Sequence, residues 1–401
     1  MPGPAISALA AGWALAAAVL EGIAVLPAEN RAPGPPSGQF IEPGATLPQP
    51  FPDQPVQGFS SVWRETKGHF LALTDNGYGS RANSADFVLR IYSLAVDFHT
   101  RSGGSGQVTV SGFVNLSDPA EHTGFPITAE RATYTGTRGG LRVDSGIREH
   151  RWLTGADLDT ESLAREPDGS YWIGDEFGPF VLHFDAGGAL LEPPYSLAGL
   201  ASPDRPGLPP GAATIRRSRG FEGMAMAPDG ARLYPMLESG PGEDPQVTFV
   251  YTFDIPQRRF LNRDANDPSY RYRLDPNAEA IGEFSMTGDG KALVVERDGG
   301  QGGAAALKKI FAVDLGRLDD QGCLAKREVA DLLAIADPDD LDGDGRNTFR
   351  FDHWTIESVV ALDAHTLLVV NDNNFPFGHA RRPDQPDGTE FIRLRVEPAL
   401  W

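Results

Sequence analysis

Acidic residues at both ends of a short hairpin are the first feature of this sequence that could do chemistry. The stretch DLDTESLAREPDGSYWIGDEFGPF has Asp157, Asp159 and Glu161 at its start, and Asp175 and Glu176 towards its end. Between its two apolar runs lies PDG, a turn sequence that joins neighbouring strands. Carboxylates gathered in this way can bind hard cations such as Ca²⁺, or exchange protons with a substrate.

The same pattern recurs along the chain. Copies begin at Gly58 (GFSSVWRETKGHFLALTDN), Gly220 (GFEGMAMAPDGARLYPMLES), Ile281 (IGEFSMTGDGKALVVER) and Ile356 (IESVVALDAHTLLVVNDN). Each copy has a strand-like run, a turn containing Gly or Asp, and an apolar run that ends in an acidic residue. Since one such unit cannot bury both of its faces alone, the repetition indicates an architecture built from packed repeats.

The spacing of the copies predicts the fold. Glu161, Glu222 and Glu283 lead three units at intervals of 61 residues, and Glu357 follows after 74. Repeats of roughly 40 to 50 residues with four strands each are typical of propeller blades, and a longer period leaves room for outer loops. We therefore expect an all-β fold, a β-propeller of five recognisable blades, each of four antiparallel strands, around a central channel. The long interval before Glu161 has room for a degenerate sixth blade.

Two segments have expected roles outside the repeats. REVADLLAIA, residues 327–336, has the best helical pattern in the chain, so we predict a short helix there. Residues 38–56 are expected to close the ring by adding a strand to the last blade.

In a propeller, the start of each first strand and the end of the second lie at the same end of the channel, because the two strands are antiparallel. This geometry predicts one acidic rim. The leading carboxylates are Glu161, Glu222, Glu283 and Glu357, and the trailing ones are Asp75, Asp175, Glu176, Glu238, Glu296 and Asp372. So many like charges need cations beside them. Divalent ions, above all Ca²⁺, suit a site rich in carboxylates; the alternative is that these residues cap loops or pair with Arg131, Arg219 or Arg297.

A second calcium signal is independent of the rim. ADPDDLDGDGRNTF contains Asp340, Asp342, Asp344 and Gly345 in the D-x-D-x-D-G spacing of an EF-hand loop. The match is incomplete, because Phe351 occupies the position of the usual glutamate. We expect an EF-like Ca²⁺ loop within a blade connection, with a solvated acidic turn as the alternative.

One basic cluster stands out in an acidic chain. IRRSRGFEGM places Arg216, Arg217 and Arg219 directly before Glu222. Arginines beside a metal-binding rim could hold a phosphate or carboxylate through paired hydrogen bonds, or they could neutralise the neighbouring glutamates.

Composition and missing motifs exclude several classes of protein. The net charge of the 401 residues is -20, so a nucleic-acid partner is not expected, because phosphate contacts need a positive surface. The single cysteine, Cys323, excludes an intrachain disulfide and a cysteine-rich metal site. The sequence has no G-x-S-x-G, H-E-x-x-H or Walker motif. A hydrolase of this sequence would therefore use metal-activated water or carboxylates.

The composition of the N-terminal region predicts an export segment. Residues 5–20 are apolar, which predicts a signal peptide or an uncleaved anchor within residues 1–28. Residues 29–54 are expected to form a Pro-rich linker, and residues 55–401 the propeller domain. We therefore expect an exported protein, periplasmic or extracellular, with no transmembrane domain beyond that possible anchor.

The ordered motifs resemble one known family. GFSSV with LTDNGYG, DLDTESLA with YWIGDEFGPF, RGFEGMAM with LYPMLES, LVVERD, and IESVV with VVNDNNF are similar to the phytase-like family, whose domain is called "esterase-like activity of phytase". The resemblance covers most of residues 55–398. It implies an exported β-propeller grouped with enzymes that hydrolyse phosphate or other esters. By similarity to propeller phytases, Ca²⁺ would bridge the enzyme, the substrate phosphate and the attacking water.

The resemblance also implies site residues, position by position. They are Glu161, Asp175, Glu176, Arg219, Glu222, Glu238, Glu296, Arg297, Glu357 and Asp372. The first unit departs from the pattern, because Ser60 or Ser61 stands where the others have glutamate.

Three functions remain open at this point. The first is a Ca²⁺-dependent ester hydrolase, a phosphoesterase acting on a small molecule as a monomer, in which Glu222 and Glu161 are catalytic and Arg219 and Arg297 bind substrate. The second is a non-enzymatic propeller, a binding or scaffold module in which calcium and ion pairs are structural. The third is a calcium-dependent lactonase.

Overall fold

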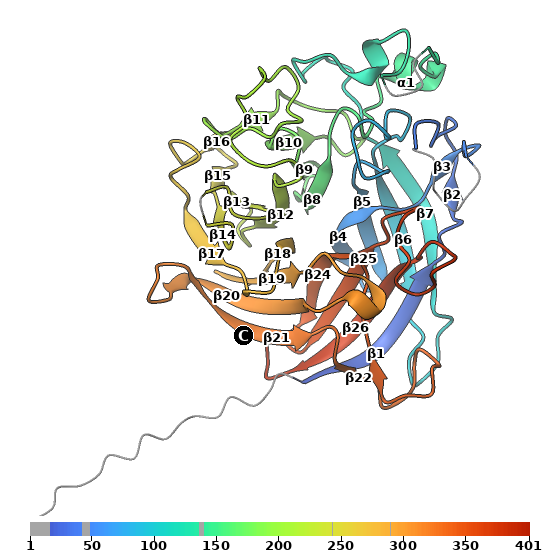
Figure 1. The fold of residues 1–401 in the computed structure, drawn as a ribbon, viewed down its shortest axis with the longest axis vertical. Helices are drawn as coiled ribbons and strands as arrows, with labels where there is room; N and C mark the ends of the chain where they lie inside the picture. The colour runs from blue at the N-terminus through green and yellow to red at the C-terminus, as the bar shows by residue number, and fades with distance from the viewer. Residues whose placement is uncertain (1–16, 42–48, 136–139, 243, 289) are drawn as a thin grey trace, which may run out of the picture.

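The computed structural model describes residues 17–41, 49–135, 140–242, 244–288 and 290–401, and its regular structure is almost entirely β (Figure 1). This confirms the expected all-β class. Five strands open the repeated units: β4 (Phe59–Thr66), β8 (Thr160–Arg165), β12 (Phe221–Met226), β18 (Ala280–Gly288) and β24 (Thr355–Asp363). Their antiparallel partners are β5 (His69–Thr74), β9 (Tyr171–Asp175), β13 (Arg232–Leu237), β19 (Lys291–Arg297) and β25 (Thr366–Asp372).

The five first strands contact one another in a closed ring, in the order β4, β8, β12, β18, β24 and back to β4. Glycines let these strands approach closely. A Cβ atom on Gly223 would lie 2.3 Å from the backbone nitrogen of Phe284, and one on Gly282 would lie 2.1 Å from the carbonyl oxygen of Ile356. No larger residue fits at either point without moving backbone. The ring confirms the propeller arrangement of inner hairpins around a common axis.

A β-bulge occurs at the same place in every first strand. The register of each inner hairpin shifts by one residue near the start of that strand. The extra residues are Ser60, Glu161, Glu222, Gly282 and Glu357. Bulges re-aim a side chain, and here they set the position that the acidic residues share.

Outer strands extend each hairpin into a sheet. In chain order they are β6 (Arg90–Asp97), β7 (Gln107–Asn115), β10 (Phe180–Phe184), β11 (Tyr195–Ser196), β14 (Val247–Val250), β15 (Phe253–Asp254), β16 (Arg259–Phe260), β17 (Tyr270–Arg273), β20 (Lys308–Leu318), β21 (Leu324–Asp331) and β26 (Thr389–Glu397). The orders β8-β9-β10-β11 and β18-β19-β20-β21 each give the four-stranded sheet expected of a blade. Buried apolar residues fill the space between adjacent sheets.

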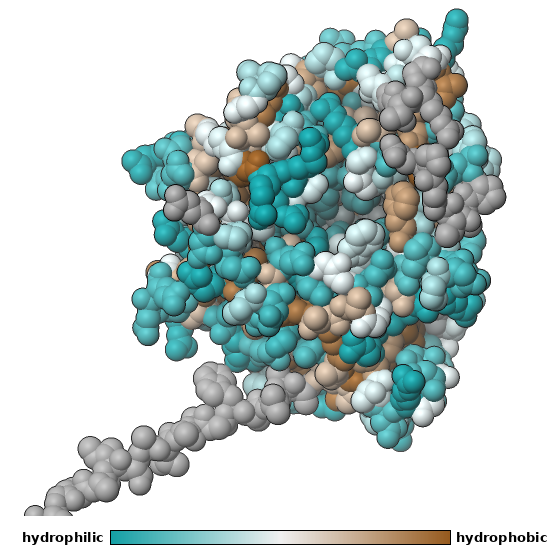
Figure 2. Space-filling view, in the orientation of Figure 1, coloured by the Kyte–Doolittle hydropathy of each residue, from teal (hydrophilic) through white to brown (hydrophobic). Residues whose placement is uncertain are grey.

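The remaining elements are short and lie in connections. They are β2 (Arg31–Ala32), β3 (Gln54–Pro55), β22 (Ile335–Ala336), β23 (Thr348–Phe349), the helix α1 (Ser145–His150) and two 3₁₀ turns at Thr128–Glu130 and Gly302–Ala304. None of the helices within the described ranges is long and apolar enough to cross a membrane. Hydrophilic residues predominate on the face drawn in Figure 2.

The strand that closes the ring comes from an unexpected part of the chain. Strand β1 (Ala17–Leu26) pairs antiparallel with β26, from Ala17 with Glu397 to Leu26 with Thr389, and Figure 1 shows the two side by side. A single parallel bridge from Val25 to Gln107 then joins β1 to β7. The ring-closing strand is therefore residues 17–26, and the prediction of residues 38–56 for this role is wrong.

This closure changes the reading of the N-terminal region. The signal peptide or anchor expected within residues 1–28 includes residues 17–26, which are a paired strand of the propeller. Parts of the expected linker, residues 29–54, are also folded, with Phe40, Ile41 and Phe51 buried in the core. The folded region therefore begins before residue 55. Most of the apolar run at residues 5–20 lies outside the described residues.

The helix predicted at residues 327–336 is also wrong. The segment forms most of β21 and then β22, and β21 pairs antiparallel with β20. The neighbouring strand offers a row of backbone donors and acceptors, and pairing with it overrides the local helical preference.

Candidate functional site

Acidic side chains from the inner hairpins meet at one end of the ring. We call the following eight carboxylates the rim cluster, because each is adjacent in space to others of the set: Asp75, Asp159, Glu161, Glu176, Glu222, Glu238, Glu357 and Asp372. Asp75 is half-buried and the other seven are buried. Seven of these residues belong to the predicted rim, and the addition is Asp159.

Two groups of three within the rim cluster are close enough to share an ion. Carboxylate oxygens of Asp159, Glu161 and Glu176 lie within 4.8 Å of one another, and so do those of Glu176, Glu222 and Glu238. Glu176 belongs to both groups. Oxygen-only triads of this size suit hard divalent cations, and a shared carboxylate is able to bridge two of them.

Burial, followed by mutual repulsion, raises the pKa values of Glu161, Glu222 and Glu357 in the rim cluster. Burial, followed by the charge of Asp372, raises the pKa of Glu357 to about 8. Burial and then Glu238 hold the pKa of Glu222 well above its ordinary range. For Glu161 the causes are burial and the charge of Asp159. Without cations, these shifts favour the protonated forms of Glu161, Glu222 and Glu357.

Two arginines supply positive charge, and both contact the same carboxylate. Nη2 of Arg297 lies 2.5 Å from Oε1 of Glu238 and 3.9 Å from Oε1 of Glu222. Arg219 donates a hydrogen bond to the other oxygen of Glu238. Burial lowers the pKa of Arg297, but attraction to Glu238 and Glu222 outweighs this and raises it. Both arginines predicted to bind substrate therefore neutralise Glu238 here.

Backbone contacts hold the acidic residues of the second hairpin in place. The Asp159 carboxylate accepts hydrogen bonds from the backbone nitrogen of Asn76 at 3.0 Å and from its side-chain amide at 2.8 Å. Glu176 accepts one from the backbone nitrogen of Gly220 at 2.9 Å. These contacts cross from one hairpin to the next, so the position of each carboxylate depends on its neighbour.

Asp175 supports the rim cluster without joining it. Its carboxylate accepts hydrogen bonds from the backbone nitrogens of Asp159 at 2.9 Å and Gly178 at 2.6 Å. Burial raises its pKa to about 7, although these bonds act in the opposite direction. Asp175 is thus a positioning residue for Asp159, and the metal-ligand role predicted for it is not what its contacts indicate.

Glu283 lies deeper in the channel than predicted. The bulge of the fourth unit falls on Gly282, so Gly282 is the structural counterpart of Glu222. Glu283 is the residue after the bulge. Its Oε1 accepts a hydrogen bond from the backbone nitrogen of Phe284 at 2.8 Å. Its side chain lines a pocket of roughly 210 Å³ inside the ring, beside residues of the other first strands.

Glu296 points away from the rim cluster. It is fully buried and bonded to Tyr272, to Lys326 and, at 2.7 Å, to the backbone nitrogen of Asp275. Because side chains alternate along a strand, Arg297 faces the rim and Glu296 faces outward between sheets. The fourth unit therefore contributes a cation where the others contribute carboxylates.

Asp159 is not among the metal ligands predicted from the sequence, although its position in the sequence indicates that it lies at the rim. Asp159 is the middle member of the acidic triplet in DLDTES, and it directly precedes β8. A residue just before a first strand lies at the rim for the same reason as one at its start.

The rim cluster fits a divalent cation on two observations. Oε1 of Glu222 is buried and has no hydrogen-bond partner among the described residues. Among the described residues, the positive side chains that act on these eight carboxylates are Arg219, Arg297 and, beside Asp372, His353. A buried acceptor without a donor and an excess of negative charge are both relieved by a metal ion.

The acidic loop between β22 and β23 also gathers carboxylates, in a different combination from the predicted one. Ligand atoms of Asp337, Asp340 and Asp342 lie within 4.8 Å of one another. Asp344 is outside this triad, since its carboxylate accepts a hydrogen bond from the backbone nitrogen of Arg346 at 2.8 Å. The D-x-D-x-D spacing therefore identified two of the three residues that meet.

Solved structures with similar folds share little sequence with this chain. A luciferin-regenerating enzyme has a TM-score of 0.38 and 10% identity, covering 86% of this chain and 94% of its own. A PQQ-bound aldose sugar dehydrogenase from Streptomyces coelicolor has a TM-score of 0.38 and 14% identity, covering 95% and 100%. An exo-β-1,3-galactanase from Phanerochaete chrysosporium has a TM-score of 0.42 and 9% identity, covering 89% and 63%.

Sequence comparison is more specific. An uncharacterized secreted protein from Arthroderma benhamiae is 27% identical over an alignment of 228 residues, and the match covers 48% of this chain and 42% of that protein. This chain thus spans less than half the length of the curated relative. The family profile "Phytase-like: Esterase-like activity of phytase" matches residues 54–375. The resemblance expected from the repeated motifs is confirmed, and the chain belongs to the phytase-like family.

Proposed function

We propose that this protein is an exported, metal-dependent ester hydrolase whose site is the rim cluster, with phosphate esters as the first substrate class to test. The observation that carries the proposal is the pair of carboxylate triads that share Glu176. Family membership supports an ester substrate. The printed description of the Arthroderma benhamiae relative as secreted supports export.

The chain's own residues would hold the ion and manage protons. Asp159, Glu161 and Glu176 would bind one cation, and Glu176, Glu222 and Glu238 a second. A divalent cation such as Ca²⁺ supplies an electrophile for a phosphoryl or carbonyl oxygen and lowers the pKa of a bound water. Oε1 of Glu222 is buried and has no hydrogen-bond partner among the described residues, so Glu222 is the best-placed residue to accept a proton.

Neither arginine would be free to bind a substrate immediately. Because Arg219 and Arg297 both contact Glu238, an anionic substrate would have to compete with that carboxylate for them. Arg219 is the more available, since its side chain is 26% exposed and that of Arg297 is 12% exposed. A substrate phosphate would therefore meet Arg219 first, and Arg297 would mainly hold Glu238 and Glu222 in place.

The test is hydrolysis by the purified chain. Phytate, p-nitrophenyl phosphate, p-nitrophenyl acetate and a simple lactone would each be assayed with EDTA and with added Ca²⁺. Glu222→Gln keeps the shape of the side chain and removes its charge, and we expect it to lower kcat by roughly 100-fold or more. Glu149→Gln changes an exposed residue of α1 and serves as the matched control. Failure of every substrate with metal present would overturn the proposal.

A second candidate is a non-enzymatic module in which the ions are structural. The occupation of both arginines by Glu238 favours it, because it leaves no free cation of this pair for a substrate anion. This candidate predicts that EDTA lowers the melting temperature while no substrate turns over.

A further inference from the structure

A second group of carboxylates lies on the outer side of the propeller, in the loop of residues 337–347 between β22 and β23. Asp337, Asp340 and Asp342 bring one ligand atom each to within 4.8 Å of the others. The loop is folded tightly, with positive φ angles at Asp340 (50°), Gly343 (74°) and Gly345 (78°). The acidic triad alone would be an ordinary solvated turn.

The state of Asp337 separates this loop from such a turn. Asp337 is 0% exposed. Its Oδ2 accepts hydrogen bonds from the backbone nitrogens of Leu341 at 2.8 Å and Asp342 at 3.4 Å, whereas Oδ1 has no hydrogen-bond partner. A buried carboxylate oxygen without a partner is costly, and an acidic triad supplies no donor for it. A bound cation would supply the missing partner and offset the charge of the triad.

The nearby basic side chains do not supply that charge. Arg346 pairs with Asp344 at 3.7 Å, and Arg101 pairs with Asp339 at 3.7 Å. Within the described ranges, no ion pair involves any member of the triad. Burial, followed by the charges of Asp344, Asp337 and Asp340, raises the pKa of Asp342. The triad thus carries uncompensated negative charge around a buried, unpartnered oxygen.

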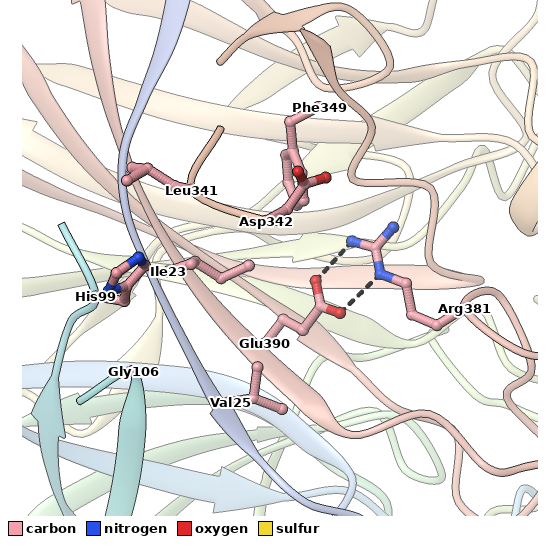
Figure 3. Close-up of a pocket in the computed structure, with 9 residues that line it drawn as sticks. All are labelled: Ile23, Val25, His99, Gly106, Leu341, Asp342, Phe349, Arg381 and Glu390. Carbon is pink, nitrogen blue, oxygen red and sulfur yellow. Dashed lines mark hydrogen bonds and ion pairs between the residues drawn. The ribbon is translucent and has the colours of Figure 1, made fainter. Parts of the chain in front are cut away.

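The acidic loop is connected to the strand that closes the ring. Asp337 directly follows β22, and Ala336 of β22 pairs with Val19 of β1 in parallel register. Figure 3 shows Leu341 and Asp342 of the loop across a pocket from Ile23 and Val25 of β1. Whatever orders this loop therefore also supports the strand that closes the ring.

We infer that Asp337, Asp340 and Asp342 form a calcium site that fastens the ring-closing strand β1 to the propeller. Ca²⁺ is the cation that the chemistry favours, because all donors are oxygens and the loop is irregular. Mg²⁺ demands near-ideal octahedral geometry and keeps more of its water. The inference does not depend on the function proposed for the rim cluster, since the two sites share no residue.

The experiment uses a protein whose rim cluster is already altered, so that the effect of calcium on the loop can be measured separately from its effect on the rim. In the Glu176→Gln background, which removes the ligand shared by both rim triads, the full chain would be melted in EDTA and in CaCl₂. We expect calcium at about 100 times its dissociation constant to raise the melting temperature by roughly 3–6 °C. Adding Asp340→Asn should abolish that rise. Asp340 is exposed, so its substitution leaves the fold intact.

The control stays in the same loop. Asp339→Asn removes the same charge from a residue outside the triad and should leave the calcium-induced rise unchanged. Calcium should also slow amide exchange in residues 17–26, and Asp340→Asn should remove that protection. An equal rise in the Asp339→Asn and Asp340→Asn proteins would overturn the inference, and so would a rise of the same size with MgCl₂ alone.

Discussion

Nη2 of Arg297 lies 2.5 Å from Oε1 of Glu238, and this ion pair is the centre of the charge balance at the rim. Arg297 also lies 3.9 Å from Oε1 of Glu222, so one buried guanidinium screens two carboxylates. The arginine occupies the position that the sequence pattern assigned to an acidic ligand. Several expectations for experiments depend on this arrangement.

Replacing Arg297 by Gln should destabilise the metal-free protein more than the calcium-bound one. Loss of the guanidinium leaves Glu238 and Glu222 buried with less compensation, and breaking a buried ion pair costs about 3 kcal/mol or more. A bound cation would supply part of the missing charge. Chemical denaturation in EDTA and in CaCl₂ measures both effects. Arg263→Gln, at a side chain that is 82% exposed, is the control and should change stability by less than about 0.5 kcal/mol.

Glu176→Gln and Glu296→Gln should have opposite signatures, although both residues were predicted ligands. Glu176 is shared by two triads, so its substitution should weaken divalent-ion binding at the rim at least roughly tenfold. Glu296 instead holds Tyr272, Lys326 and the backbone of Asp275, so its substitution should lower stability and leave the ion affinity of the rim unchanged. Calorimetric titration with Ca²⁺ distinguishes them. Equal losses of affinity would show that the rim has been assigned wrongly.

The metal-free protein should lose stability as the pH rises. Burial and the charge of Asp372 raise the pKa of Glu357 to about 8. Burial also raises the pKa of Asp372 to about 6, although hydrogen bonds from Asn374 and Thr355 act in the opposite direction. Since these folded-state values exceed the ordinary ones, the folded protein binds more protons than the unfolded chain between about pH 4 and 8. Stability is then fullest at the acidic end and falls through this interval.

Thermal melts at pH 5, 6, 7 and 8 in EDTA measure that fall. Calcium should reduce it, because the ion replaces the protons on the same carboxylates. A melting temperature in EDTA that rises from pH 5 to pH 8 would contradict the protonation of the rim cluster.

Truncation should reveal the importance of β1. A protein without residues 1–16 keeps all of the described strand pairing and serves as the reference. Removing residues 1–28 deletes β1 and exposes the edge of β26, along with Ile392 and Leu394 of β26, which now share a buried cluster with Leu20. This shorter protein should aggregate or melt at a clearly lower temperature. Light scattering and calorimetry on the two products make the comparison.

The sequence was sufficient to predict the repeats and most of the rim, for a physical reason. Turn residues and apolar runs are local signals, and the antiparallel geometry of a hairpin converts their spacing into a common end of the channel. The sequence alone therefore predicts that Glu161, Glu176 and Glu222 lie together. The family resemblance rests on the same ordered motifs.

The predictions for Glu283 and Glu296 are wrong because a shift of one residue along a strand changes the direction in which a side chain points. Glu283 continues the 61-residue spacing, but the bulge of its strand falls on Gly282. Glu296 and Arg297 are adjacent, and the alternation of the strand sends only the arginine to the rim. No local signal reports where a bulge lies, because its position depends on the neighbouring strand.

The strand at residues 17–26 could not be predicted for a different reason. An apolar run near the start of a chain has the same composition whether it is a leader, an anchor or a buried strand, and only the edge of β26 identifies residues 17–26 as a strand. That edge is more than 360 residues away, so a reading based on neighbouring residues could not find it.

This pairing also orders events during synthesis. Strand β1 leaves the ribosome long before β26 exists, so it has no partner for its nine-residue register until the fifth hairpin has been made. Contacts of such long sequence separation form slowly, because loop closure has to precede them. The ring therefore completes as a late, chain-spanning step, and until then an apolar segment at the N-terminus is exposed to chaperones, membranes and other nascent chains.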